Sequence, residues 1–259
     1  MVPIRRLNKE QVEAFFEVGF VVQPNVFSPA EVDTIRAAFV RLEDIANTLS
    51  TERMLKGSQF VVERVCSEPG VSSVRIHRVV WCGAAEPILS RYGMDRRLLE
   101  MASQLLGSAE MNQLINQAHF KLPGDGVEFP WHQDSTHRRF GGNDWRDLNG
   151  RGSYVQTVTA IDTVTHDNGP LEFIPGSCRH GHVPLTQDGL LPSSLDARAA
   201  VSTTMEAGSV LLFGPYSFHC SRPNSSREPR RVFINGFAYP GANKRVYPGD
   251  GAGRLVRVS

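Results

Sequence analysis

The sequence predicts a mainly β protein with flanking helices, and three observations support this prediction. Apolar residues at helical spacing dominate roughly residues 1–110. Short apolar runs separated by Gly, Pro and Asn follow over roughly residues 111–245. The chain has 259 residues, enough for one large domain with its own core. We therefore expect a single domain over residues 1–259, with helices packed around a sandwich or barrel of antiparallel strands.

The helices of the first part are recognised by their starts and ends. Ser28 stands three residues before Glu31, with Pro29 between them, which is a typical capping sequence with Pro at the first helical position. Apolar residues then recur at helical spacing: Val32, Ile35, Phe39 and Leu42. A further helix is predicted between Asp95 and Gly107, because Gly commonly ends a helix.

Strands are predicted wherever short apolar runs lie between turn residues. A first short strand is expected at residues 19–22, between two helices. The later strands are expected at residues 114–121, 153–162, 171–174, 209–213 and 232–239. Residues 138–152 and 187–200 are polar, and we expect both to be surface loops.

Composition excludes several classes of protein. The net charge is +1, which argues against nucleic-acid binding through a basic surface. No apolar run is long enough for a membrane span, and residues 1–6 lack the apolar region of a signal peptide. The four cysteines lack Cys-x-x-Cys spacing, which fits free thiols in the reducing cytoplasm: Cys66, Cys82, Cys178 and Cys220.

His132, Asp134 and the distant His219 form the main candidate site. On an extended strand, His132 and Asp134 would point to the same face, because side chains alternate from one face to the other. Two histidines and one carboxylate, with open positions opposite them, are the ligands typical of non-haem Fe(II) oxygenases. The same three residue types with a water also suit zinc, so a zinc-dependent hydrolase is an alternative.

Arg230 and Arg231 are both candidates for a cation that such an iron site needs when it uses 2-oxoglutarate. When the iron uses 2-oxoglutarate, a cation must bind the far carboxylate of this acid, and Arg does so as a two-pronged donor. On the strand, Arg230 shares a face with small and aliphatic residues, whereas Arg231 shares the other face with Phe233 and Phe237. The smaller face leaves room for a cavity, so Arg230 is the better candidate.

Several motifs together resemble the phytanoyl-CoA dioxygenase family. They are WHQD at 131–134, DNGPL at 167–171, IPGS at 174–177 and HCS at 219–221, followed by Arg230. The opening segment 7–27 is also similar, so the resemblance covers most of the chain in order. Members of this family are Fe(II)- and 2-oxoglutarate-dependent oxygenases on a double-stranded β-helix, the jelly-roll fold of cupin-like proteins.

The resemblance implies a role for each matching residue. It implies iron ligands at His132, Asp134 and His219. It implies 2-oxoglutarate binding by Arg230, Ser221, Gln117 and Gln156. Relatives that halogenate carry a small residue in place of the carboxylate, so Asp134 implies hydroxylation or a related oxidation with O₂, releasing succinate and CO₂. Intact Asp134 and Arg230 also argue against the remaining alternative, a non-catalytic ligand-binding jelly roll.

The partner is expected to be a small-molecule substrate, with neither nucleic acid nor membrane involved. Candidate substrate-binding residues lie before the metal motif and in the loop after it: Arg75, His77, Arg78, Arg138, Arg139, Trp145 and Arg146. Clustered arginines suit an anionic group, because guanidinium matches carboxylate and phosphate geometry. The sequence thus predicts a small polar or anionic substrate. It contains no feature from which an oligomeric state is predicted.

Overall fold

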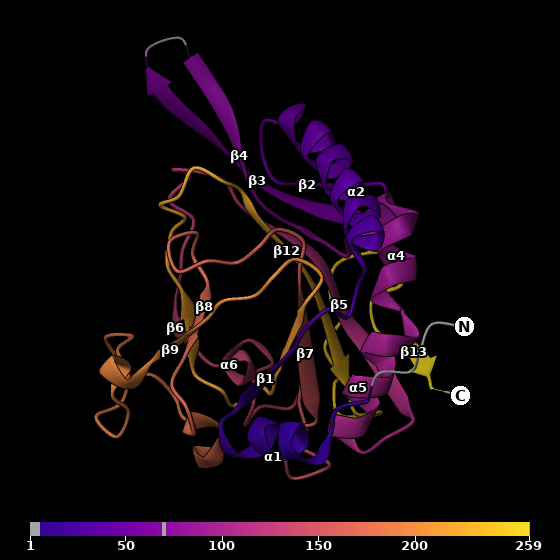
Figure 1. Cartoon of the computed structure of the whole chain (residues 1–259), viewed down its shortest axis with the longest axis vertical. Coiled ribbons are helices and arrows are strands. Elements are labelled where there is room, and N and C mark those ends of the chain that lie inside the picture. Colours follow the sequence, from indigo (N-terminus) through magenta and orange to yellow (C-terminus); the bar gives the residue numbers. More distant parts are fainter. Residues whose placement is uncertain (1–5, 69–70, 259) are drawn as a thin grey trace.

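The structure is a computed structural model in which residues 6–68 and 71–258 are described. Residues 1–5, inspected above for a leader, and the side chain of Cys66 lie outside this described part. Two antiparallel sheets form the body, with helices along one side of the larger sheet, and the β3–β4 hairpin projects from the body (Figure 1). Within the described part, no helix has the length and apolar character to cross a membrane.

The first 106 residues contain both helices and strands, and strands predominate afterwards. The helices are α1 (Lys9–Glu17), α2 (Pro29–Asn47), α3 (Cys82–Ala85), α4 (Pro87–Gly93), α5 (Arg96–Leu106) and α6 (Asp134–His137). The strands of this first part are β1 (Phe20–Gln23), β2 (Arg53–Leu55), β3 (Ser58–Glu68) and β4 (Val71–Val80). The later strands are β5 (Glu110–Lys121), β6 (Phe129–His132), β7 (Tyr154–Ala160), β8 (Leu171–Phe173), β9 (Val201–Thr203), β10 (Val210–Phe213), β11 (His219–Ser221), β12 (Arg230–Ala238) and β13 (Arg254–Arg257). Two short 3₁₀ helices, η1 (Ser177–His180) and η2 (Ala197–Ala199), lie in loops.

The two sheets differ in size. The larger one has the order β1-β10-β7-β12-β5-β4-β3-β2, with β13 also paired to β5. The smaller one has the order β6-β11-β8-β9. Every strand pairing is antiparallel, as the expected jelly roll requires. The prediction of a mainly β jelly roll with flanking helices is therefore confirmed.

Alternation along β5 and β12 separates two apolar cores. Phe120 and Phe233 point to the helix side, where α2 and α5 bury their apolar faces. Val232 and Ile234 point to the opposite side, into a second core between the two sheets. A period of two residues therefore gives one face of the large sheet to the helices and the other to the interior of the jelly roll.

The predicted helix starts are present, because the caps form as expected. Ser28 Oγ accepts from the Glu31 backbone, and the Glu31 side chain accepts from the Ser28 backbone. Asp95 caps α5, and Gly107 ends it with a left-handed backbone, φ +68°. The predicted strands are present within a few residues of their expected limits.

The expectation of a helical first part was incomplete. Strands β2, β3 and β4 lie within it, and they extend the large sheet beyond β5. The only strand predicted for this part of the chain was the short one at residues 19–22. These strands are set by pairing, since β4 pairs with β5 through Arg78, Val79 and Val80. Tertiary pairing overrides local propensity here.

Candidate active site between the two sheets

A cavity of about 380 Å³ lies between the two sheets. Its polar lining comprises Arg78, Gln117, His119, His132, Asp134, His137, Arg138, Gln156, His219, Ser221 and Arg230. Its apolar lining comprises Ile115, Phe129, Val158, Leu171, Phe213, Val232 and Ile234. Both sheets contribute residues, so the cavity exists only once the jelly roll is closed.

His132 and His219 are brought together by strand pairing. They stand opposite each other on β6 and β11, and their ring centroids are 4.2 Å apart. His132 Nδ1 lies 2.8 Å from the carbonyl of Pro130, and His219 Nδ1 lies 2.9 Å from the carbonyl of Ser217. A carbonyl only accepts, so in the neutral form of each ring the proton is on Nδ1. The Nε2 lone pair of each ring is therefore left for a ligand.

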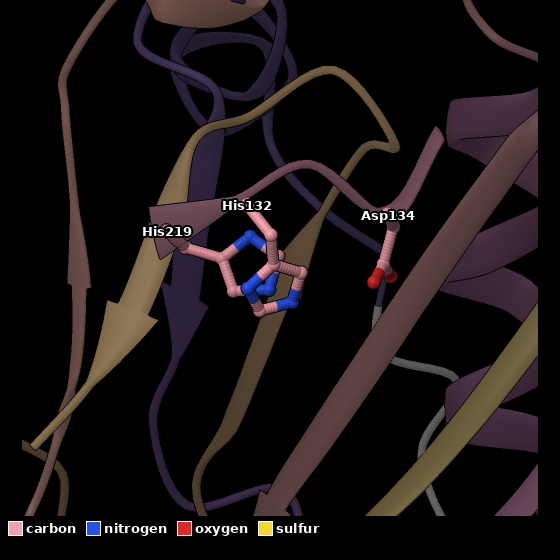
Figure 2. A group of neighbouring side chains, drawn as sticks. All are labelled: His132, Asp134 and His219. Carbon is pink, nitrogen blue, oxygen red and sulfur yellow. The ribbon is translucent and has the colours of Figure 1, made fainter. Parts of the chain in front are cut away.

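Asp134 faces the two imidazoles from the start of α6. Gln133 keeps an extended backbone with φ −110° and ψ 141°, so the strand geometry assumed from the sequence holds up to the carboxylate. The three side chains converge, with the carboxylate on one side and the overlapping rings on the other (Figure 2). Their candidate ligand atoms all lie within 4.8 Å of one another.

The charges at this cluster suit a metal cation. Asp134 Oδ2 is buried and no described residue donates to it. Burial opposes ionisation of Asp134, but the charges of Arg138 and the histidines prevail, and the pKa of this carboxyl is lowered. Burial and His132 lower the pKa of His219 to about 3, so its ring is neutral at pH 7. A buried carboxylate to which no described residue donates, beside two imidazoles whose Nε2 atoms are left for a ligand, fits an Fe(II) ligand set.

Gln133, between two of these residues, fixes the segment to its surroundings. It is fully buried. Its amide nitrogen donates to the carbonyls of Gly181 at 2.9 Å and Tyr216 at 2.6 Å, and its oxygen accepts from Val183 N at 2.8 Å. These bonds tie the metal motif to two loops, which restricts how far His132 and Asp134 can move.

The other polar end of the cavity is formed by Arg230 and its neighbours. Arg230 Nη2 donates to the carbonyl of Gly169 at 2.5 Å and to Ser221 Oγ at 3.0 Å. Lys121 Nζ donates to the same Ser221 Oγ at 2.6 Å. Burial lowers the pKa of Arg230 to about 10. Burial and the charge of Arg230 together lower the pKa of Lys121 to about 7. Arg231 points away and forms an ion pair with Asp162 at 2.8 Å.

The two glutamines predicted from the sequence both line the cavity, and each is oriented by a neighbour. His119 Nε2 donates to Gln117 Oε1 at 2.8 Å. The Tyr154 hydroxyl donates to Gln156 Oε1 at 2.7 Å, and it accepts from Arg138 at 2.6 Å. Both amide oxygens are thereby occupied. The NH₂ groups of Gln117 and Gln156 are left to donate to a ligand.

Most of the predicted substrate-binding residues are not brought to the cavity. Arg75 and His77 contact Glu63 on β3 instead, at 3.1 and 3.3 Å, because their strand face carries that carboxylate. Arg139 is exposed and pairs with Asp144 at 3.0 Å. Arg146 is likewise absent from the lining, and Trp145 is buried in the second core.

Arg138 does line the cavity, but not as the exposed side chain that was expected. It is 5% exposed, and its guanidinium lies over the rings of Tyr154 and Tyr247, at 4.2 and 5.4 Å from their centroids. The sequence could not show this, because Tyr154 and Tyr247 are far from Arg138 along the chain.

His137 also lines the cavity, although no role was predicted for it from the sequence. It follows Asp134 by three residues within α6, and residues at this spacing share one face of a helix. Its ring contacts His132 edge-on, with centroids 5.0 Å apart. Predicting the one-turn helix α6 after the metal-binding strand would have placed His137 beside Asp134.

Comparison with known proteins agrees with this geometry. The family model described as "Phytanoyl-CoA dioxygenase (PhyH)" matches residues 15–232. The chain belongs to the phytanoyl-CoA dioxygenase family. It is an Fe(II)- and 2-oxoglutarate-dependent dioxygenase that uses O₂, as the motifs implied.

Individual relatives place it within that family. It is 30% identical to an ectoine dioxygenase of Bordetella bronchiseptica over 251 residues, 88% of this chain and 74% of that protein. It is 27% identical to an L-proline trans-4-hydroxylase of Streptomyces griseoviridis over 246 residues, 83% of this chain and 81% of that one. The crystal structure of EctD from S. alaskensis with bound Fe superposes with a TM-score of 0.69 at 25% identity, over 94% of this chain and 80% of that chain.

Proposed function

We propose that this dioxygenase hydroxylates a small polar or anionic metabolite, with iron bound by His132, Asp134 and His219. The observation that carries this proposal is the convergence of two imidazoles and one ionised carboxylate, whose candidate ligand atoms lie within 4.8 Å of one another. Asp134 Oδ2 supports the proposal most strongly. It is buried and accepts no hydrogen bond from any described residue, whereas buried oxygens normally accept at least one.

We propose further that 2-oxoglutarate extends from this metal site to Arg230. Arg230 and Ser221 would bind its far carboxylate, and Gln117 and Gln156 would donate to its oxygens. When bound, the iron with 2-oxoglutarate and O₂ supplies the oxidising chemistry, which yields succinate, CO₂ and hydroxylated substrate.

The chain contributes position and electrostatics to this reaction. The carbonyls of Pro130 and Ser217 hold the imidazoles with Nε2 toward the metal. Asp134 stays ionised because Arg138 and the histidines favour its charge despite burial. Apolar side chains form part of the cavity lining and would contact the carbon skeleton of a bound substrate: Ile115, Val158, Leu171, Phe213 and Ile234.

The size of the substrate is inferred from the cavity and the relatives. A volume of about 380 Å³ shared with 2-oxoglutarate suits a small molecule. The relatives are named for ectoine and L-proline, which are both small and polar. We also propose that residues 1–259 act as one domain in a reducing compartment such as the cytoplasm, which the free thiols of Cys82, Cys178 and Cys220 support.

Anaerobic titration with Fe(II) and 2-oxoglutarate tests this assignment. The complex should show a visible charge-transfer band that requires both additions, because the keto acid would bind directly to iron held by His132, Asp134 and His219. His219→Ala should lose the band, whereas the control His180→Ala, an exposed histidine outside the cavity lining, should keep it.

Two outcomes would contradict the proposal in different ways. Zinc at stoichiometric content after anaerobic purification, without the band, would favour a zinc-dependent hydrolase. A normal band without succinate release across a panel of small metabolites would favour a non-catalytic ligand-binding protein.

A further inference from the structure

Three arginines line the cavity, and they differ in whether their donors are already used. Arg138 donates to the hydroxyl groups of two tyrosines, and Arg230 donates to a carbonyl and a hydroxyl, as described above. For Arg78, no hydrogen bond or ion pair with any described residue is present. Arg78 therefore brings an unused fork of donors to the cavity.

Strand register places Arg78 on the cavity side of the large sheet. Arg78 on β4 stands opposite His119 on β5, and His119 stands opposite Val232 on β12. Paired residues share one face of a sheet, and all three line the cavity. Arg230 stands two residues further along, opposite Lys121. Two strand spacings and two residues put the Cα atoms of Arg78 and Arg230 about 12 Å apart.

The positive charge of Arg78 is not balanced by an anionic partner among the described residues. Partial burial lowers the pKa of Arg78, which means that its charge is incompletely solvated. Glu52 acts in the opposite direction, but its carboxylate accepts from Gln59 at 2.5 Å and forms no ion pair with Arg78. Burial is the main cause of the lowered pKa values of His119 and His137, and the charge of Arg78 contributes to both, so its field acts on two of the four histidines that line the cavity. An anion in the cavity would offset this uncompensated charge.

We propose that Arg78 binds an anionic group, a carboxylate or a phosphonate, of the molecule that is hydroxylated, and thereby selects the substrate. This inference rests on the proposed function, because it assigns Arg230 to the far carboxylate of 2-oxoglutarate. That cosubstrate has a second carboxylate beside its keto group, which is the other source of the same chemistry. The test must therefore separate the substrate from the cosubstrate.

Arg78→Met removes the charge and keeps much of the length, and Arg78→Lys keeps the charge without the fork. Arg139→Met is the matched control, since Arg139 is exposed, paired with Asp144 and outside the cavity. Binding is measured by calorimetry on the anaerobic enzyme with Fe(II) and 2-oxoglutarate. The probes are small carboxylates and phosphonates, each paired with its neutral amide or ester, such as cyclopentanecarboxylate and cyclopentanecarboxamide.

Wild type should bind the anionic member of a pair more tightly than the neutral member. Arg78→Met should raise the Kd of the anion about 30-fold, leave that of the neutral member unchanged, and remove the preference. Arg78→Lys should give an intermediate Kd, which keeps the test decisive if the Met variant fails to fold. Arg139→Met should behave as wild type.

Three results would overturn the inference without touching the iron assignment. They are preference of wild type for neutral probes, absence of binding by every anionic probe, and a rise in the Kd of 2-oxoglutarate in Arg78→Met comparable to that in Arg230→Ala. The last would assign Arg78 to the cosubstrate. Failure of the proposed function is seen separately, as absence of the charge-transfer band before any probe is added.

Discussion

Replacing Arg230 by alanine tests the cosubstrate end of the cavity. Arg230 is 5% exposed, and its Nη2 already donates to Gly169 and Ser221. Its Nε is buried, and no described residue accepts from it. A carboxylate bound here would meet a desolvated guanidinium that still has an unused N–H, which is the setting in which a charge-assisted hydrogen bond is strong.

The expected loss follows from that environment. Truncating one partner of a buried, hydrogen-bonded charge pair costs about 2–5 kcal/mol. Since each 1.4 kcal/mol is tenfold, the Kd of 2-oxoglutarate should rise roughly 30-fold or more. Lys121 limits the loss, because burial and the charge of Arg230 now lower its pKa to about 7. Without Arg230 that repulsion disappears, so Lys121 holds its proton more firmly and attracts part of the carboxylate charge.

The assay is the charge-transfer band of the anaerobic Fe(II) enzyme, titrated with 2-oxoglutarate. Arg231→Ala is the matched control, because Arg231 lies on the other face of β12 and pairs with Asp162. It should leave the Kd close to wild type and lower the thermal stability instead. An unchanged Kd in Arg230→Ala, or a larger rise in Arg231→Ala, would refute the assignment of the two arginines.

Three further predictions concern the metal end. Asp134→Asn should bind Fe(II) much more weakly by metal analysis, because the site loses its only anionic ligand; retained stoichiometric iron would show that Asp134 is not a ligand. Tyr154→Phe removes the hydroxyl that orients Gln156, so KM for 2-oxoglutarate or substrate should rise while the iron content stays normal; loss of iron instead would indicate a merely structural role. The pKa of His219 is lowered to about 3 in the folded protein, so the unfolded chain binds the extra proton between about pH 6.5 and 3. Stability of the metal-free protein should therefore fall as pH drops below 6.5, and thermal melts of His219→Leu should show a shallower decline; equal slopes would contradict this pKa.

The fold could be predicted to the extent that local signals specify it. Capping sequences located α2 and α5, and turn residues between apolar runs located the strands of the jelly roll. The β2–β4 extension could not be located in this way. Its strands are held by pairing with β5 and with one another, and such pairing has no local signature.

The same division holds within the active site. Parity along β12 was enough to prefer Arg230 to Arg231 as the residue facing the cavity, because alternation depends only on the strand being extended. The substrate-binding residues were harder to predict from the sequence. Arg138, for example, lies after the metal motif, and its direction depends on contacts with Tyr154 and Tyr247. Arg75 and His77 were predicted to bind substrate, but their face of the strand meets Glu63 rather than the cavity.

The sequence by itself determined the fold class, the metal ligand types and the class of reaction, because these depend on residue identity, spacing and alternation. Only the tertiary structure decided which histidine nitrogens are free, which of the three cavity arginines has no partner among the described residues, and how large the cavity is. Those properties arise where β4, β5, β6, β11 and β12 meet, and each depends on neighbours that are distant in sequence. The strength of a buried charge is set by the groups that closing the jelly roll brings around it, so it becomes defined only in the folded protein.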